Sequence, residues 1–294
     1  DRWAIQNDLF SLCVSGDEQV RNYLDFSDAY FDEDSYLASV NVAHNLASLY
    51  FRAFDEKFIE EIRSYAINYF RKILSNLGWE PQKSDKHTDA LLRTFTIAVL
   101  GKMNDDSVTV EAIRKYHKFL KSPSSLSPDL IETICSIAAW NGNSKTFAEL
   151  KKLYTNAKTM EEKLRFLGAM CGFQDKKLLV RTLNFSQTPE VRSQNMQLPI
   201  MKVAGNPYGE KVLWPWLKKN WKNINKKVGH GNPLFNRIVA SIAGVADDSM
   251  ENEIKLFFKN NPTPGTERTQ SQTLERIRIN SKFLRTMRKE FKNG

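Results

Sequence analysis

The chain has 294 residues, of which 41% are hydrophobic and 26% charged, and a formal net charge of +9. This composition excludes a disordered or collagen-like chain, and no apolar run reaches the roughly 18 residues that a membrane span needs, so we expect a soluble protein. Residues 1–50 carry a net charge of −7 and residues 201–294 carry +10. The basic last third could attract nucleic acid, an acidic surface or a peptide carboxylate.

The N-terminus has neither an initiator Met nor a basic-then-apolar signal layout, so we expect a chain cut from a longer protein. Its three cysteines, Cys13, Cys135 and Cys171, lie far apart without CxxC spacing. An odd, scattered set of this kind predicts buried free thiols rather than disulfides or a thiolate metal site.

Apolar residues recur at spacings of three and four through almost the whole chain, which predicts α-helices. Several helix starts carry capping signals: Ser127-Pro128, Thr188-Pro189, Asn232-Pro233, and Thr159 with Glu162 as a capping box. Division at such signals predicts about fifteen helices, near residues 3–15, 18–30, 35–54, 56–77, 88–102, 108–120, 128–141, 144–155, 160–171, 174–184, 189–203, 208–227, 233–245, 249–260 and 267–291.

The short connections between these helices indicate antiparallel pairs that repeat every 25 to 40 residues or so. We therefore predict an all-α fold in one domain, residues 1–294. Its helix pairs would stack into a curved α-solenoid of the HEAT or armadillo kind with a concave face. A closed helical bundle is the alternative, because no strict sequence period accompanies the pairs.

Sequence motifs for catalysis and metal binding are absent. The four histidines are far apart and none belongs to HExxH, and the chain has no P-loop, GxGxxG, GxSxG or calcium loop. We expect no catalytic residue and no metal ligand in this chain.

Two segments combine aromatic and charged residues. Between residues 25 and 36, acidic and aromatic side chains alternate, which predicts a solvated connection held by the aromatic rings, with docking of a peptide amine or a basic surface as the alternative. Residues 212–221 could form a stacking platform for single-stranded nucleic acid. Helical spacing instead predicts that this second segment turns four residues into the core and leaves its lysines in water: Leu213, Trp214, Leu217 and Trp221.

Two basic features remain as candidate binding residues. Arg237 lies opposite the apolar arc of its predicted helix and beside the small Ser241 and Gly244, so its guanidinium could hold a carboxylate in a bidentate way. The last predicted helix carries a stripe of cations at helical spacing, which is either a solvated face or a second set of contacts: Arg278, Lys282, Arg285 and Lys289.

Seven motifs, in this order along the whole chain, resemble the C-terminal helical domain of gluzincin-type zinc aminopeptidases. That family includes the puromycin-sensitive, the endoplasmic-reticulum antigen-trimming and the tricorn-interacting aminopeptidases, and the resemblance is greatest to the puromycin-sensitive and tricorn-associated branch. The motifs are Asp1-Arg2 with Gln6-Asn7-Asp8-Leu9-Phe10-Ser11-Leu12, Leu77-Gly78-Trp79-Glu80-Pro81, His87-Thr88-Asp89-Ala90-Leu91-Leu92-Arg93, Gly205-Asn206-Pro207-Tyr208-Gly209, Trp216-Leu217-Lys218-Lys219-Asn220-Trp221, Asn236-Arg237-Ile238, and Phe257-Phe258 with Glu267-Arg268-Thr269.

The resemblance implies a non-catalytic domain that encloses a chamber over the zinc site and contacts the C-terminal part of an oligopeptide. The Zn²⁺ ligands and the general base would lie in a catalytic domain upstream of this chain. Arg237 occupies the position of a basic residue that reaches toward the active site in relatives. The Tyr-Lys pair that endoplasmic-reticulum relatives place near Val40-Asn41 is absent, so their length-measuring behaviour is not expected.

The partners implied are the parent's own N-terminal and catalytic domains, a peptide substrate and a larger protease of the tricorn or proteasome pathway. A cytoplasmic location is implied, and neither a membrane nor nucleic acid is expected as a partner. The alternative function is a free-standing HEAT-like scaffold that uses its basic last third to bind an acidic protein or nucleic acid.

Overall fold

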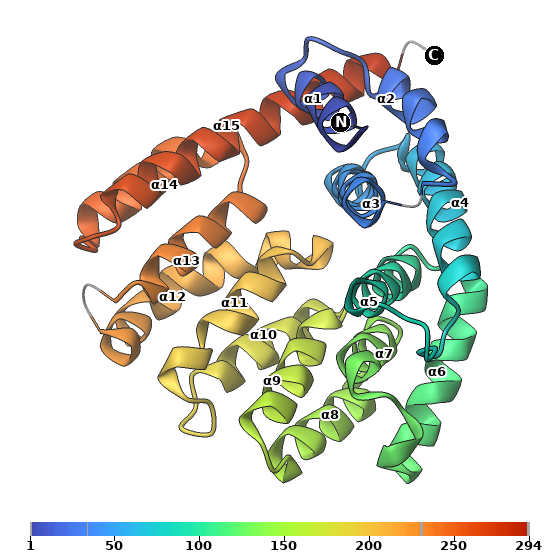
Figure 1. Cartoon of the computed structure of the whole chain (residues 1–294). Coiled ribbons are helices and arrows are strands. Elements are labelled where there is room, and N and C mark those ends of the chain that lie inside the picture. The colour runs from blue at the N-terminus through green and yellow to red at the C-terminus, as the bar shows by residue number, and fades with distance from the viewer. Residues whose placement is uncertain (1, 34, 230–231, 293–294) are drawn as a thin grey trace. The chain divides into compact units, whose positions relative to one another are not determined.

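The computed structural model describes residues 2–33, 35–229 and 232–292. Within these ranges the chain forms fifteen α-helices and seven short 3-10 segments and contains no strand (Figure 1). The prediction of an all-α fold is therefore confirmed. None of the helices in the described ranges has the length and apolar character needed to cross a membrane.

The chain divides into two compact units, one of residues 1–134 with 282–294 and one of residues 135–281, and it passes between them within α7 and again within α15. The helices are α1 (Arg2–Ser15), α2 (Val20–Ser27), α3 (Tyr36–Arg52), α4 (Ile59–Leu77), α5 (His87–Lys102), α6 (Asp106–Lys121), α7 (Pro128–Trp140), α8 (Ser144–Asn156), α9 (Met160–Ala169), α10 (Lys176–Ser186), α11 (Gln197–Ala204), α12 (Glu210–Val228), α13 (Leu234–Ser241), α14 (Glu251–Asn260) and α15 (Glu267–Glu290).

The first unit, which we call unit 1, stacks its helices in two layers. α1, α3 and α5 pack side by side in one layer, while α2, α4 and α6 form the other (Figure 1). Each helix also packs against the next one along the chain from α3 to α6. This alternation between layers is the local arrangement that stacked helical hairpins produce.

A buried polar network lies in the core of unit 1. The Tyr23 hydroxyl donates to Gln6 Oε1 at 3.0 Å, and the Asn45 amide donates to Gln6 Oε1 at 3.1 Å and to the Tyr23 hydroxyl at 3.0 Å. Burial raises the pKa of Tyr23 to about 12, so the hydroxyl stays protonated and can donate. The network joins α1, α2 and α3 and leaves none of these three polar groups unsatisfied.

The acidic and aromatic segment after α2 is the connection that its sequence predicts, apart from residue 34, which lies outside the described residues. Phe31 packs its ring edge-on against Tyr65 and Tyr69, with centroids 5.9 and 5.3 Å apart. The Tyr65 hydroxyl donates to Asp28 Oδ1 at 2.7 Å, and Lys72 forms an ion pair with Asp32 at 2.7 Å. The segment is therefore held by aromatic packing and by its own ion pairs.

The start of α6 is fixed by a buried carboxylate. Asp105 accepts hydrogen bonds from the Val108 amide at 3.0 Å, from the Ser107 hydroxyl at 2.6 Å and from Arg71 Nε at 2.6 Å. Burial raises the pKa of Asp105, but these three hydrogen bonds outweigh it and bring the pKa below the usual value of 3.8. Asp105 thus caps α6 in its charged form.

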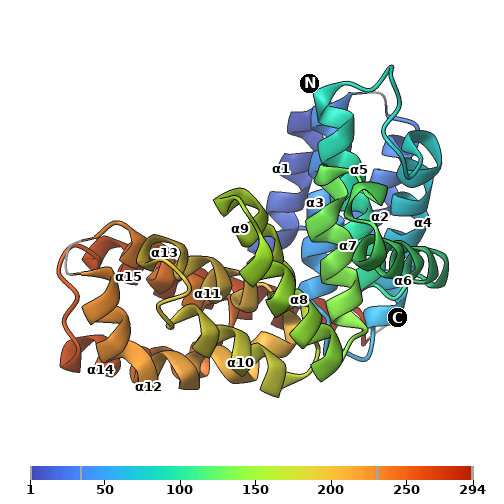
Figure 2. The ribbon, with the colours of Figure 1, turned by 90° about the horizontal axis from the view of Figure 1, so that it is seen from below.

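The second unit, which we call unit 2, repeats the two-layer alternation. α9, α11 and α13 form one layer, and α10 and α12 pack side by side in the other (Figure 2). The Thr159–Glu162 capping box at the start of α9 is confirmed, with the Glu162 amide 3.2 Å from Thr159 Oγ1 and the Thr159 amide 3.1 Å from Glu162 Oε2. Stacking of the pairs into a curved solenoid over the whole chain stays a prediction.

One predicted helix start is wrong. Thr188-Pro189 does not begin a helix, and α11 begins only at Gln197. The chain between α10 and α11 instead turns several carbonyls toward Lys227 of α12, whose ammonium group donates to the carbonyl oxygens of Ser186, Thr188 and Val191 at 2.9–3.0 Å. A helix over these residues would use the same carbonyls for its own backbone hydrogen bonds. The hydrogen bonds from Lys227 therefore take the place of the helix start that Thr188-Pro189 predicts.

Candidate functional site

Arg237 lies on the exposed side of α13, as its sequence position predicts. Phe235, Ile238 and Val239 of the same helix are fully buried, whereas Arg237 is exposed. Among the described residues, its guanidinium has no hydrogen-bond or ion-pair partner. It is therefore available to an external anion.

The helix that carries Arg237 is held on two sides. Asn236 accepts a 2.6 Å hydrogen bond from the Thr269 hydroxyl of α15, and the Asn280 amide of α15 donates to the carbonyl of Ala243 just after α13. Gly244 lies so close to α11 that a Cβ would sit 2.8 Å from the carbonyl oxygen of Ala204. Close packing against α11 accounts for this glycine, and the resulting contacts fix the position of Arg237.

The three candidate cations of α15 have partners within the chain. Arg278 pairs with Glu251 at 3.2 Å, and Lys282 donates to the carbonyl of Ser15 at 2.8 Å. Arg285 is exposed, but it too interacts with another group of the chain. Of the four candidate residues, Arg237 alone is free of partners among the residues that the structure describes.

The four candidates do not form one cluster. Arg237 and Arg278 belong to unit 2, whereas Lys282 and Arg285 belong to unit 1. Within unit 2, a hydrogen bond places Thr269 of α15 beside Asn236 of α13. Arg278 lies roughly two helical turns, or about 12 Å, further along α15 than the part of α15 that lies beside Arg237.

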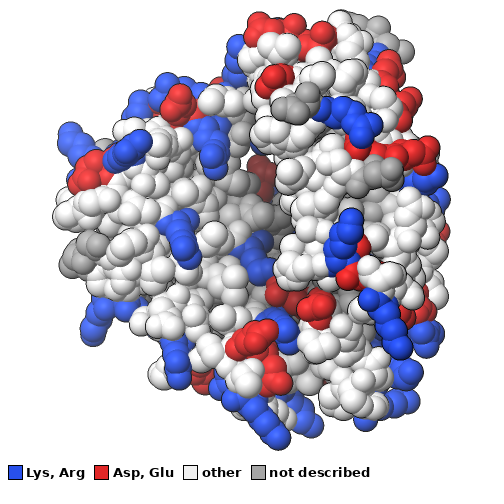
Figure 3. Space-filling model, in the orientation of Figure 1, with Lys and Arg blue, Asp and Glu red and all other residues white. Residues whose placement is uncertain are grey.

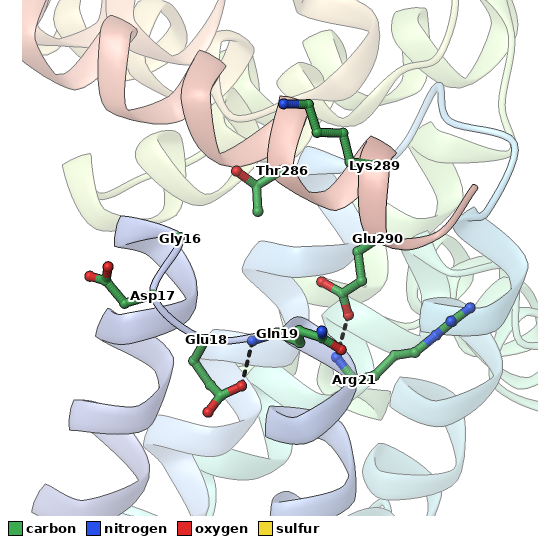
Figure 4. Close-up of a pocket in the computed structure, with 8 residues that line it drawn as sticks. All are labelled: Gly16, Asp17, Glu18, Gln19, Arg21, Thr286, Lys289 and Glu290. Atoms are coloured by element: carbon green, nitrogen blue, oxygen red, sulfur yellow. Dashed lines mark hydrogen bonds between the residues drawn. The ribbon is translucent and has the colours of Figure 1, made fainter. Parts of the chain in front are cut away.

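One of the exposed, unpaired cations among the described residues of unit 1 lies near a polar pocket. Lys289 is exposed on α15, and the pocket of about 600 Å³ lies between the end of α1, the start of α2 and the end of α15 (Figure 4). The pocket is lined by Gly16, Asp17, Glu18, Gln19, Arg21, Thr286, Lys289 and Glu290.

Glu290 explains much of the geometry of that pocket. Its carboxylate accepts hydrogen bonds from the backbone amides of Val20 at 3.0 Å and Arg21 at 2.8 Å, as Figure 4 shows for Arg21. The residue before α2, Gln19, makes no side-chain cap, so Glu290 satisfies the first amides of α2 from the far end of the chain. The sequence offers no local signal for this cap, because the two segments are 270 residues apart.

The tryptophan segment of α12 belongs to the core, as its spacing predicts. Trp214, Leu217 and Trp221 are at most 2% exposed, and Leu213 is fully buried. Trp216, which the spacing did not select, is also buried, and its Nε1 donates to Asn184 of α10 at 2.8 Å. The interpretation as a stacking platform for single-stranded nucleic acid is wrong, because these rings are not accessible.

Several of the motifs that carry the family resemblance contact one another. Arg93, at the end of one motif, is 1% exposed and donates to the carbonyls of Leu77 and Gly78 in another, both at 3.0 Å. Arg93 also forms an ion pair at 2.5 Å with Asp85, which lies in the loop between the two motifs. Arg93 therefore closes the C-terminal end of α4 and holds the following loop.

Two further pairs of motifs meet in unit 2. The Trp221 ring packs edge-on against Phe257 and Phe258, with centroids 5.3 and 5.7 Å apart. Asn236 and Thr269 form the hydrogen bond between α13 and α15 described above. The Asn206 amide, from the remaining motif of unit 2, donates to the carbonyls of residues 171 and 173 at 2.9 Å.

These contacts give several of the motif residues a structural role. Arg237 is one of three motif cations, with Lys219 and Arg268, that are exposed and contact no polar group of the described chain. A buried or paired motif residue needs no function beyond folding, whereas an exposed, unpaired arginine does little for stability. Of the four residues proposed from the sequence, Arg237 is the one that meets this description, which makes it the strongest of those candidates.

The described side chains do not offer a metal site. Within residues 2–33, 35–229 and 232–292, no three His, Cys, Asp or Glu side chains lie close enough together to share a metal ion. All three cysteines are buried and free, and burial raises the pKa of the Cys13 thiol to about 12, so this thiol is protonated and a poor ligand. The group of side-chain ligands that zinc needs is therefore not found among the described residues.

Positive and negative side chains are mixed on the surface of each unit. In Figure 3, lysine and arginine side chains are interspersed with aspartate and glutamate side chains, and neither sign forms one continuous patch on the part of either unit that the view displays.

Comparisons with known proteins give consistent matches. The model of the family described as ERAP1-like C-terminal domain matches residues 1–279. Aminopeptidase M1-A of rice (Oryza sativa subsp. japonica) is 26% identical over 301 aligned residues, which cover 100% of this chain and 34% of that protein. Aminopeptidase M1 of Arabidopsis thaliana is 26% identical, with 99% and 34% covered, and Aminopeptidase 2, mitochondrial, of Saccharomyces cerevisiae is 24% identical, with 97% and 30% covered. The chain thus spans about a third of the length of these relatives.

Proposed function

Since the chain belongs to the family of ERAP1-like C-terminal domains, we propose that it is the non-catalytic C-terminal domain of a zinc-dependent aminopeptidase that trims oligopeptides. Its partners would be the N-terminal and catalytic domains of the same protein, and Zn²⁺ would be held in the catalytic domain. The match over residues 1–279 to a family of C-terminal domains is the observation that carries this proposal.

The domain would act by shape and by charge. As one curved solenoid of helix pairs, residues 1–294 would enclose the chamber in which the peptide lies, and such a wall selects extended peptides over folded proteins. Oligopeptides released in the cytoplasm by a larger protease of the tricorn or proteasome kind would be the substrates.

Arg237 would contact the C-terminal part of the peptide. Its guanidinium is exposed and has no partner within the described chain, and the hydrogen bond between Thr269 and Asn236 holds the helix that carries it. Such an arginine suits bidentate binding of a carboxylate. Arg278, Lys282 and Arg285 already interact with groups of the chain. They would therefore attract the peptide by longer-range electrostatics rather than by direct contact.

Arg237→Ala in the full-length enzyme tests this role. We expect the KM for peptides to rise about tenfold, since one charge-assisted bidentate contact contributes about 1.5 kcal/mol. Turnover of an aminoacyl amide, which has no peptide carboxylate, should not change. Arg276→Ala is the matched control, because Arg276 is also exposed on a helix of unit 2 and has no described partner.

Two results would contradict different parts of the proposal. Unchanged kinetics of Arg237→Ala across peptides of all lengths would remove Arg237 from the binding surface. Turnover of an aminoacyl substrate by the isolated, zinc-loaded 294-residue chain, free of contaminating peptidase, would show that the domain is itself catalytic.

A further inference from the structure

The outer side of α12 carries a stripe of lysines. Beyond Glu210 the helix has no acidic residue, and its exposed lysines fall within an arc of about 100° along a length of about 22 Å. The opposite side of the helix, with its three tryptophans, is buried in unit 2. The exposed lysines are Lys211, Lys218, Lys219, Lys222 and Lys226.

Most of these charges are not compensated. Lys218 is paired with Glu253 of α14. The other four have no hydrogen-bond or ion-pair partner among the described residues, and we call them the lysine face: Lys211, Lys219, Lys222 and Lys226. Like charges one helical turn apart, such as Lys222 and Lys226, destabilise a helix, so the arrangement costs stability.

The neighbouring helix α10 also carries exposed cations. α10 packs beside α12, and Trp216 Nε1 joins the two helices through Asn184. Lys177 and Arg181 are exposed on α10, with the Arg181 guanidinium over the Phe147 ring at 4.3 Å. Because the Arg181 guanidinium packs on a ring of α8, the lysine face is formed by α12 alone.

We propose that the lysine face binds an acidic segment of a partner protein in extended conformation. The charges are spread over about 22 Å, so a small anion would reach only one or two of them. Lys222 and Lys226 are displaced by about 6 Å along the helix, and Lys211 and Lys219 by about 12 Å. These displacements are close to one and two repeats of the distance of about 6.6 Å between alternate side chains of an extended peptide, so carboxylates on such a peptide can meet these ammonium groups.

Other polyanions fit the same surface less well. Single-stranded nucleic acid is bound by stacking on aromatic rings, but all three tryptophans of α12 are buried. Insertion into a lipid surface needs apolar side chains beside the cations, and α12 exposes no large apolar residue. The lysine face also lies on a different helix from Arg237, so the inference does not depend on the proposed function.

Binding of a labelled peptide to the whole chain tests the proposal. The probe is a fluorescein-labelled peptide of about eight residues with alternating Glu and Ser, long enough to cover the lysine face. Fluorescence anisotropy at increasing salt gives the dissociation constant. The combined variant K219Q/K222Q/K226Q should weaken binding about tenfold and make the salt dependence shallower.

The control removes the same charge elsewhere. Lys57, Lys83 and Lys118 are exposed in unit 1 without described partners, and K57Q/K83Q/K118Q should leave the peptide affinity unchanged. Equal loss in both triple variants would overturn the proposal, because binding would then follow net charge alone. Tighter binding to a DNA duplex, or to vesicles rich in phosphatidylserine, than to the peptide at the same salt would also overturn it.

Discussion

Replacement of Arg93 by alanine should destabilise unit 1 strongly. The side chain is 1% exposed and makes three contacts at once, with two carbonyls at the end of α4 and with the carboxylate of Asp85. Alanine would leave all three acceptors without this donor. Asp85 is only 16% exposed, so water would replace the lost contact incompletely.

The magnitude follows from the hydrogen bonds that the buried Arg93 guanidinium donates to the carbonyls of Leu77 and Gly78. A hydrogen bond from a charged group contributes about 1.5 kcal/mol, so we expect the loss of the two to cost about 3 kcal/mol. For a unit of this size the loss corresponds to a melting temperature lower by about 10 °C. Arg93→Lys should fall between wild type and alanine, since one ammonium group cannot reach all three acceptors.

Urea unfolding followed by far-ultraviolet circular dichroism measures the effect. Arg114→Ala is the control, because Arg114 is an arginine of the same unit that is 60% exposed and pairs only with Glu111, one turn away. No measurable change is expected for that variant. If Arg93→Ala proved as stable as Arg114→Ala, the contacts between the two motifs would not support the fold, and our structural explanation of these motifs would fail.

Three further variants test other contacts. Gly209→Ala should cost about 3 kcal/mol, because its Cβ would come within 1.9 Å of the carbonyl oxygen of Val203, whereas Gly205→Ala, with no atom nearer than 3.7 Å, should change the urea midpoint little. Lys227→Met should speed amide hydrogen exchange in the loop between α10 and α11, since it removes the donor to three carbonyls. Asp105→Asn should reduce the loss of stability in acid, because the pKa of Asp105 is lowered in the folded protein. A carboxylate of this kind stabilises the protein above its unfolded pKa, and this stabilisation disappears as the pH falls below about 4 through the folded pKa.

Each of these expectations has a clear contrary result. Equal urea midpoints for the two glycine variants would mean that the backbone near Gly209 yields easily. Unchanged exchange in Lys227→Met would show that the loop is held by other contacts, such as the hydrogen bond from the Tyr154 hydroxyl to the carbonyl of Glu190. A parallel decline of wild type and Asp105→Asn between neutral pH and about pH 3 would contradict the lowered pKa.

Local patterns predict the helices of this chain well. The period of apolar residues identifies the buried side of α12, and the pairing of Thr159 with Glu162 locates the start of α9. Both signals lie within one or two helical turns, where side-chain geometry follows directly from sequence spacing.

Contacts between distant residues could not be predicted in the same way. The false helix start at Thr188 arises because Lys227 binds the carbonyls there, and no local rule anticipates a donor from another helix. The stripe on α15 has correct helical spacing, but spacing does not reveal that Arg278 already pairs with Glu251. Whether Arg237 is free depends likewise on every neighbour in space, so only the fold distinguishes it from the paired cations.

The cap that Glu290 provides for α2 has a consequence for the order in which the protein is made. Unit 1 is assembled from segments before and after unit 2, which is continuous from residue 135 to residue 281. A ribosome delivers α2 before unit 2 and Glu290 after it, so the first amides of α2 lack their carboxylate, and the Phe58 ring lacks the stacked Phe291, until unit 2 has been made. Unit 1 thus begins to emerge before unit 2 and is completed after it, and a chaperone that shields nascent chains would find its binding surface there.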